Sequence, residues 1–148
     1  MVLRTDAVRE RLLKLEEVIS RLEELQRVDA ATLRLNFRDA WTVERGLQLG
    51  AEAIFDIGNH ILSGHFGVSS KDYEDIIGQL TAQQVIDEPL RQRLKGLGGF
   101  RNVLVHDYLR LDLDRVAEAL AKAPADFSEF ARQVRRWLAA ATGTAGEG

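Results

Sequence analysis

The segment WTVERGLQLGAEAIFDIGNHIL, residues 41–62, decides the fold class of this 148-residue chain. Its apolar residues recur every three or four positions, which is the spacing of one face of an α-helix. The same pattern begins after Asp29, a residue suited to cap a helix. It therefore predicts one helix of more than about 30 residues, long enough to bend. The positions on the shared face are Leu33, Phe37, Trp41, Leu47, Ala51, Ile54, Ile57 and Ile61.

Helical patterns also precede and follow this segment. Asp6 is placed to cap a first helix that ends near Leu25. A loop is expected over residues 63–70, because Ser and Gly cluster there. A short helix to Leu80 follows, and Thr81 is placed to cap a further turn.

The C-terminal half is predicted to hold three more helical stretches. Pro89 suits the first turn of a helix that continues through residues 101–106. Asp112 is placed to cap a helix over 113–122, and Pro124 is expected to end it before a last helix begins. The fold class that we predict is all-α, an antiparallel helical bundle of about five main helices with one long second helix.

Composition restricts the class of protein further. The length is that of a single domain, expected over residues 1–140, with a disordered tail at 141–148. The absence of cysteine excludes disulfides and thiolate zinc sites, and it fits the cytoplasm, where we expect the protein. The N-terminus does not resemble a signal peptide, and no stretch approaches the ~20 apolar residues of a membrane helix.

Charge is distributed unevenly along the chain. The formal net charge is −3, whereas residues 91–111 hold five basic side chains and one acidic one. Such a patch can contact phosphates, but charge alone favours an ordinary solvated helix face. The basic residues are Arg91, Arg93, Lys95, Arg101 and Arg110, and the acidic residue is Asp107.

The stretch RNVLVHDY, residues 101–108, carries the candidate site. On an ideal helix each residue advances about 100°, so Asn102 and His106 share a face. Arg101 and His106, in contrast, point about 140° apart. Either the helix ends near His106 and the chain turns, or a second subunit completes the site. A hydrogen-bonded structural histidine is the alternative to a catalytic one.

Glycines form two further patterns. KGLGGF, residues 95–100, lacks the spacing of a phosphate-binding loop and does not follow a predicted strand. Gly46, Gly50 and Gly58 lie at four- and eight-residue steps on the predicted long helix. We interpret both patterns as small residues that permit close approach between helices.

The other two histidines do not form a convincing metal pattern. His60 and His65 are five residues apart around a Ser-Gly turn, whereas a helical metal site favours a spacing of four and needs more ligands. Asp56 lies four residues before His60, which predicts a carboxylate–imidazole pair on one helix face. No metal site is expected.

The pattern R-x-x-x-x-H-x-Y within residues 101–108 resembles the signature of HEPN-fold proteins and, among them, the HepT family. Residues 41–62 resemble the second helix of that family, and GGFRNVLVHDYLRLDLDRV, residues 98–116, resembles the region around its motif. The likeness covers nearly the whole chain. It implies a metal-independent endoribonuclease that acts as a homodimer and is the toxin of a toxin–antitoxin pair.

The resemblance also implies roles for the motif residues. RNA carries its own nucleophile, the 2′-hydroxyl, so His106 is expected to act as general acid or base, because imidazole titrates near neutral pH. Arg101 is expected to clamp the phosphate and to stabilise the negative charge of the transition state. Asn102 is expected to orient the imidazole or bind phosphate, and Tyr108 to hydrogen-bond the substrate.

Partners and regulation follow from the same resemblance. The expected partners are an RNA substrate and an MntA-like nucleotidyltransferase antitoxin, which uses ATP to attach AMP to Tyr108. No cofactor is expected in the chain itself. Glu44 and Arg45 resemble a polar pair that the family carries on its second helix, and they are expected to support the site. An ordinary ion pair is the alternative for them.

Two rival functions belong to other classes of protein. One is a non-catalytic helical module that docks onto a nucleotidyltransferase and presents its substrate. The other is a plain dimeric scaffold. The intact Arg101, His106 and Tyr108 favour the ribonuclease over both.

Overall fold

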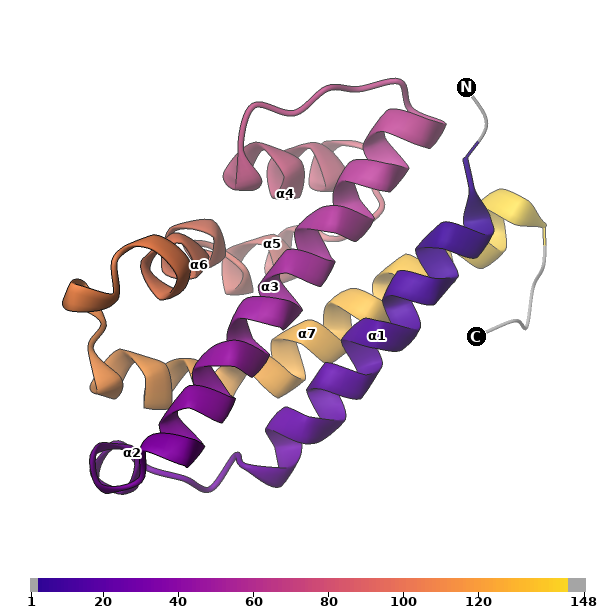
Figure 1. Ribbon diagram of the computed structural model, residues 1–148. Coiled ribbons are helices and arrows are strands. Elements are labelled where there is room, and N and C mark those ends of the chain that lie inside the picture. Colours follow the sequence, from indigo (N-terminus) through magenta and orange to yellow (C-terminus); the bar gives the residue numbers. More distant parts are fainter. Residues whose placement is uncertain (1–2, 144–148) are drawn as a thin grey trace.

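The computed structural model describes residues 3–143, except for the side chain of Tyr108. These residues form an all-α bundle, as predicted, with one turn of 3-10 helix (Figure 1). The elements are α1 (Thr5–Glu24), α2 (Ala30–Leu35), α3 (Phe37–His65), α4 (Tyr73–Ala82), α5 (Glu88–Arg93), α6 (Leu97–His106), η1 (Tyr108–Arg110) and α7 (Leu113–Thr142).

Three long helices form the body of the bundle. α1 packs on both α3 and α7 and runs antiparallel to them, and α3 also packs on α7 (Figure 1). α4 and α6 lie against α3, and α5 reaches α7. All seven α-helices contribute to one hydrophobic core, so α6, which carries the candidate site, is fixed against the long central helix.

The long helix predicted to begin at Asp29 is in fact two helices. Asp29 caps α2 as predicted, because its carboxylate accepts a hydrogen bond from the Thr32 amide at 2.8 Å. Asn36 then leaves the helical conformation with ψ of 94°, and its side chain accepts hydrogen bonds from the amides of Arg38 and Asp39 at 3.1 and 3.2 Å. The prediction of one continuous helix was wrong because Asn36 caps a new helix without disturbing the apolar spacing.

The break places two aromatic residues on the surface. Phe37 and Trp41 were predicted to lie on the buried face, but they are 58% and 66% exposed. Their rings meet edge to face with centroids 5.1 Å apart. Helical spacing alone does not show which part of a stripe has a partner helix to cover it.

Several helix boundaries also differ from the prediction. Arg4, not Asp6, is the N-cap of α1, and Asp6 lies in the first turn. α3 continues to His65, into the predicted loop. Thr81 lies inside α4, where its hydroxyl donates a hydrogen bond to the carbonyl of Ile77, and it does not cap a further turn. Such ends are set by local contacts that propensity does not resolve.

The helix predicted to run from Pro89 into the motif is interrupted. Pro89 lies in the first turn of α5 as predicted, and α5 ends at Arg93. Gly96 then adopts φ of 85°, a left-handed conformation that glycine reaches without steric cost, and α6 begins at the next residue. The glycine-rich stretch therefore sets the start and the direction of the motif helix.

Pro124 does not end a helix, contrary to the prediction. Asp112 caps α7 as expected, and the helix then continues through Pro124 to Thr142. The Pro124 side chain is buried in the core, and this packing offsets the lost backbone hydrogen bond, which costs about 3 kcal/mol in a helix interior. The helix includes the first two residues of the predicted tail, and residues 144–148 lie outside the described part of the chain.

The glycines of α3 permit the close packing that the sequence predicted. A Cβ atom added at Gly58 would lie 2.6 Å from Ile76 of α4, and one added at Gly50 would overlap the ring of Phe127 in α7. Gly46 similarly faces Leu22 of α1. Side chains of three neighbouring helices thus pack directly against the backbone of α3 at these glycines.

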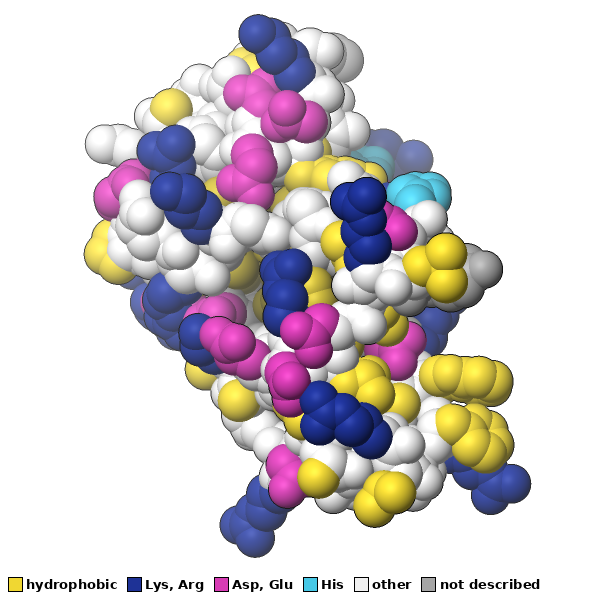
Figure 2. All heavy atoms as spheres, turned by 90° about the vertical axis from the view of Figure 1, so that its left-hand side faces the viewer, with side chains coloured by type: hydrophobic (Ala, Val, Ile, Leu, Met, Phe, Trp, Pro, Cys, Tyr) yellow, Lys and Arg dark blue, Asp and Glu magenta, His cyan; other side chains and the backbone are white. Residues whose placement is uncertain are grey.

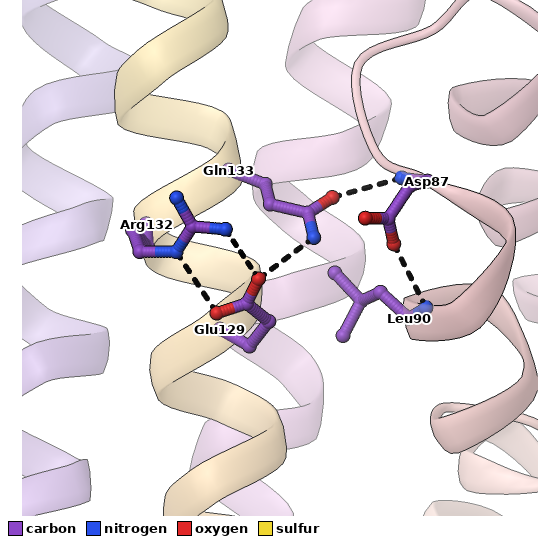
Figure 3. A network of polar contacts seen from close by, with 5 residues as sticks. All are labelled: Asp87, Leu90, Glu129, Arg132 and Gln133. Atoms are coloured by element: carbon purple, nitrogen blue, oxygen red, sulfur yellow. Dashed lines mark hydrogen bonds and ion pairs between the residues drawn. The ribbon is translucent and has the colours of Figure 1, made fainter.

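A polar network joins the start of α5 to α7 (Figure 3). The Gln133 side chain accepts a hydrogen bond from the Asp87 amide at 2.8 Å and donates one to Glu129 at 2.9 Å. Hydrogen bonds from Arg132 and Gln133 lower the pKa of Glu129 to about 2. Because Asp87 also caps α5 by accepting from the Leu90 amide, this network holds the segment that leads into α6.

Candidate active site

Arg101 is held at the junction of α6 and α3. Its Nε and Nη2 atoms donate hydrogen bonds to Glu52 Oε1 at 3.2 and 2.9 Å. Its guanidinium carbon also lies 5.5 Å from the centroid of the Tyr73 ring, a cation–π contact. The side chain is only 18% exposed, so these contacts fix the direction of the guanidinium of Arg101.

Glu52 was not identified from the sequence. Burial alone would raise the pKa of its carboxyl group, but hydrogen bonds from Gln48 and Arg101, with the charges of Arg101 and Arg45, outweigh this effect. The net result is a pKa below the ordinary value, so Glu52 stays ionised as the counter-ion of Arg101. The sequence offered one indication of this residue, because an acidic side chain stands four positions after Gln48 within an otherwise apolar helix.

Glu44 and Arg45 were expected to support the site. The carboxylate that binds Arg101 belongs to Glu52, two turns further along α3. Arg45 acts on this pair through its charge, which helps to lower the pKa of Glu52. Glu44 is half-buried, and burial raises the pKa of its carboxyl group.

The second half of the motif lies at the other end of α6. The helix ends at His106, and Asp107 is its C-cap with φ of −136° and ψ of 54°. The chain therefore turns just after His106, as the first of the two alternatives from the sequence required. His106 is exposed. Asn102 accepts a long hydrogen bond of 3.4 Å from Arg101. The side chain of Tyr108 lies outside the described part of the structure.

The motif residues are not gathered into one cluster within a single chain. Arg101 faces α3, whereas His106 is solvent-exposed one and a half turns further along α6. The apolar side chains Val103 and Val105 between them are only partly buried, and Leu109 in η1 is 84% exposed. Apolar side chains are therefore partly exposed at the surface beside the motif.

The basic stretch at residues 91–111 is largely neutralised by ion pairs. Arg101 is paired with Glu52, as described above. Three other cations also have a carboxylate within 4 Å: Arg91 pairs with Glu88, Arg93 with Asp126 and Arg110 with Asp107. Among these five basic residues, Lys95 alone forms no ion pair with the described residues. Most of the basic side chains that make up this charge excess are thus neutralised by a carboxylate close in space.

The remaining histidine prediction is confirmed. His60 lies 3.4 Å from Asp56, whose carboxylate also accepts a hydrogen bond from Arg11 at 2.5 Å. Within residues 3–143 no group of three His, Asp or Glu side chains is arranged to hold a metal ion. The described helices also include none that is long and apolar enough to cross a membrane.

The all-α bundle, with an Arg–Asn pair on α6 and a His–Asp–Tyr run that begins at the last residue of that helix, defines the HEPN class of fold. The chain belongs to the HepT-like ribonuclease family, whose model matches residues 15–134. It is 30% identical over 128 residues to the mRNA nuclease HepT of Shewanella oneidensis, an alignment that covers 84% of this chain and 93% of that protein.

Two further relatives extend the comparison. The tRNA nuclease HepT of Aphanizomenon flos-aquae is 29% identical over 121 residues, covering 81% of this chain and 82% of that protein. The structure of a tri-AMPylated Shewanella oneidensis HEPN toxin in complex with its MNT antitoxin matches with a TM-score of 0.79 and 27% identity. That match covers 88% of this chain and 98% of the toxin.

Proposed function

We propose that this protein is a cytoplasmic endoribonuclease, the toxin of a toxin–antitoxin pair whose antitoxin is a nucleotidyltransferase. The observation that carries the proposal is Arg101, fixed by Glu52 with its side chain 18% exposed, on the same helix as an exposed His106. A non-catalytic docking module would not need a half-buried counter-ion to orient an arginine. The names of the relatives, an mRNA nuclease and a tRNA nuclease, support the same reading.

The proposed reaction is an intramolecular transesterification of RNA. The 2′-hydroxyl loses its proton as its oxygen attacks the adjacent phosphorus, and the bond from phosphorus to the 5′-oxygen breaks as that oxygen takes up a proton. His106 accepts the first proton or supplies the second, and the other proton is exchanged with the second histidine of a dimer or with solvent. Arg101 stabilises the negative charge that develops on the non-bridging oxygens. The products are a 2′,3′-cyclic phosphate and a 5′-hydroxyl end.

Because the RNA supplies the nucleophile, we predict that cleavage needs no metal ion. The purified protein should cut single-stranded RNA at the same rate with and without EDTA. Analysis of the product ends should give a 2′,3′-cyclic phosphate, which is resistant to direct phosphatase treatment, and a 5′-hydroxyl. Loss of cleavage on chelation, with recovery on addition of magnesium, would overturn this mechanism.

Glu52 is expected to act as a positioning residue for Arg101. Glu52→Gln keeps the shape of the side chain but removes the charge that fixes the guanidinium, so kcat should fall about tenfold or more while KM changes less. Glu16→Gln, which removes the carboxylate that accepts two hydrogen bonds from Arg135 between α1 and α7, is the matched control and should keep the wild-type rate. A Glu52→Gln protein with wild-type kcat would show that Arg101 does not depend on this partner.

We also propose that the active form is a homodimer in which two copies of α6 face each other. Arg101 and His106 are separated within one chain, and a single histidine per chain does not readily serve as both acid and base. The partly buried Val103 and Val105 and the exposed Leu109 would be covered by the second copy.

The dimer proposal predicts concentration-dependent association. Sedimentation should give a dimer at micromolar concentration, and Val105→Glu should produce a folded monomer with strongly reduced cleavage, because it places a charge in the apolar contact. Leu13→Glu, at a 64% exposed position on α1, is the control. A wild-type monomer with full activity would refute the proposal.

A further inference from the structure

A cavity of about 250 Å³ lies between the α5–α6 junction and α7. The chemistry proposed above does not use it. The apolar part of its lining includes Leu94, Phe100 and Ala123. Phe100 immediately precedes Arg101, so the wall of this cavity and the candidate site belong to the same turn of α6. The cavity is large enough to accept one planar nucleobase.

The rim of this cavity carries two ion pairs. Arg93 Nε lies 2.7 Å from Asp126, and Lys122 Nζ lies 3.4 Å from Glu118. Within each pair the two charges neutralise one another. On the face of the molecule that carries α6 and the start of α7, basic and acidic side chains accordingly alternate (Figure 2).

Two further cations at the rim have no such partner. Lys95 and Arg115 line the cavity, and neither forms an ion pair with the described residues. The guanidinium carbon of Arg115 lies 5.6 Å from the centroid of the Phe100 ring, so a cation–π contact holds this charge at the mouth. The cavity therefore combines an apolar interior with an excess of two positive charges, which suits a base attached to a phosphate.

The groove on the other side of α6 has the opposite charge. It lies beside Asn102 and is lined by Glu52, Asp56 and Asp72, with Lys71 as its basic residue. Glu52 and Asp56 are paired with Arg101 and Arg11, whereas Lys95 and Arg115 at the rim of the first cavity are cations unpaired among the described residues, and they attract a phosphate. The α7 side of α6 is therefore the side on which a nucleotide that flanks the Arg101 site meets these unpaired cations.

We propose that this cavity is a subsite for one nucleotide of the RNA substrate, away from the bond that is cleaved. Its base enters the apolar interior beside Phe100, and Lys95 and Arg115 contact its phosphate. Phe100 and His106 are six residues apart, about 9 Å along the helix, so a short stretch of single strand spans both. This inference rests on the proposed ribonuclease function and adds to it a site that holds substrate.

The test measures RNA binding in a protein that cannot cut. In a His106→Ala background, Lys95→Ala combined with Arg115→Ala should raise the Kd for a fluorescein-labelled single-stranded RNA about tenfold at moderate salt. It should also reduce the salt dependence of binding by one to two phosphate contacts, about 0.7 each in log–log slope. The control is Lys14→Ala with Arg21→Ala, which removes two exposed cations from α1. Equal Kd values for the two double variants would overturn the subsite.

A second variant tests the interior of the cavity. Ala119→Met adds volume inside the lining without changing charge, and it should raise the Kd for RNA severalfold while the thermal midpoint of unfolding stays near that of the parent. Unchanged RNA affinity in this folded variant would show that no base enters. Free AMP and ATP at millimolar concentration should not displace the RNA; displacement that depends on Lys95 would assign the cavity to a free nucleotide instead.

Failure of the subsite is distinguishable from failure of the ribonuclease proposal. In the otherwise wild-type protein, Lys95→Ala with Arg115→Ala should raise KM and leave kcat at saturating RNA within about twofold, because these residues do not touch the reacting bond. A wild-type protein that cleaves RNA with a KM unaffected by this change refutes the subsite alone. A wild-type protein that cleaves no RNA refutes both.

Discussion

Replacement of His106 by alanine should abolish RNA cleavage and leave the fold intact. His106 is exposed at the last residue of α6 and makes no contribution to the hydrophobic core. Its removal therefore creates no cavity and leaves no buried polar group without a hydrogen-bond partner. If the imidazole moves the proton in the rate-limiting step, cleavage should fall by a factor of about 10² to 10⁴. The measurement is cleavage of labelled RNA, with circular dichroism and the thermal midpoint as evidence of folding.

The other histidines provide the control for this prediction. His60→Ala removes a half-buried imidazole that pairs with Asp56 on α3, outside the motif. Its cleavage rate should stay close to that of the wild type. In cells, expression of the wild-type protein without antitoxin should arrest growth, and His106→Ala should relieve the arrest. Full cleavage by a folded His106→Ala protein would remove this residue from the mechanism.

Replacement of Tyr108 by phenylalanine should make the toxin resistant to its antitoxin. A related HEPN toxin has been observed in the tri-AMPylated state with its MNT antitoxin, and we propose Tyr108 as the acceptor in this chain. In the modification, the phenol oxygen attacks the α-phosphorus of ATP, pyrophosphate leaves, and the phenol proton passes to solvent. The adduct brings a phosphodiester charge and an adenine to the end of α6, where RNA must bind.

The surroundings of Tyr108 suit such a role. It begins η1 directly after the C-cap of α6, and its neighbours Leu109 and Arg110 are largely exposed. Arg110 lies 3.3 Å from Asp107. This exposed pair is weak in solvent, so the guanidinium is free to move to an added phosphate. Modification should therefore block the substrate groove with a group that resembles the product.

Incubation with the partner nucleotidyltransferase and ATP, followed by intact-mass measurement and peptide mapping, tests this prediction. The wild type should gain AMP on the peptide that contains Tyr108 and lose cleavage activity, whereas Tyr108→Phe should gain none and keep at least part of its activity, less any contribution of the hydroxyl to substrate binding. Tyr73→Phe is the matched control, because Tyr73 is the only other tyrosine and its ring stacks on Phe55 at 4.3 Å. Adducts on another residue, or inhibition of Tyr108→Phe without an adduct, would exclude Tyr108 as the control point.

The sequence by itself determined the fold class and most of the helices. Apolar spacing and capping residues act over a few positions, so Asp29, Asp112 and Pro89 marked helix starts correctly. The two errors at Asn36 and Pro124 have the same origin. Whether a cap interrupts a periodic stretch, or a buried proline is carried through a helix, depends on the surfaces that pack against it.

The sequence also indicated the motif and its family, but only the tertiary structure decided the surroundings of each motif residue. Glu52 and Arg101 are 49 positions apart and meet because α3 and α6 pack together. The same packing pairs Arg93 with Asp126 and leaves Lys95 and Arg115 unpaired at the rim of a cavity. Ion pairing acts over a few ångströms in space, whatever the separation along the chain. The order of charges in the sequence therefore did not predict which of them would be neutralised.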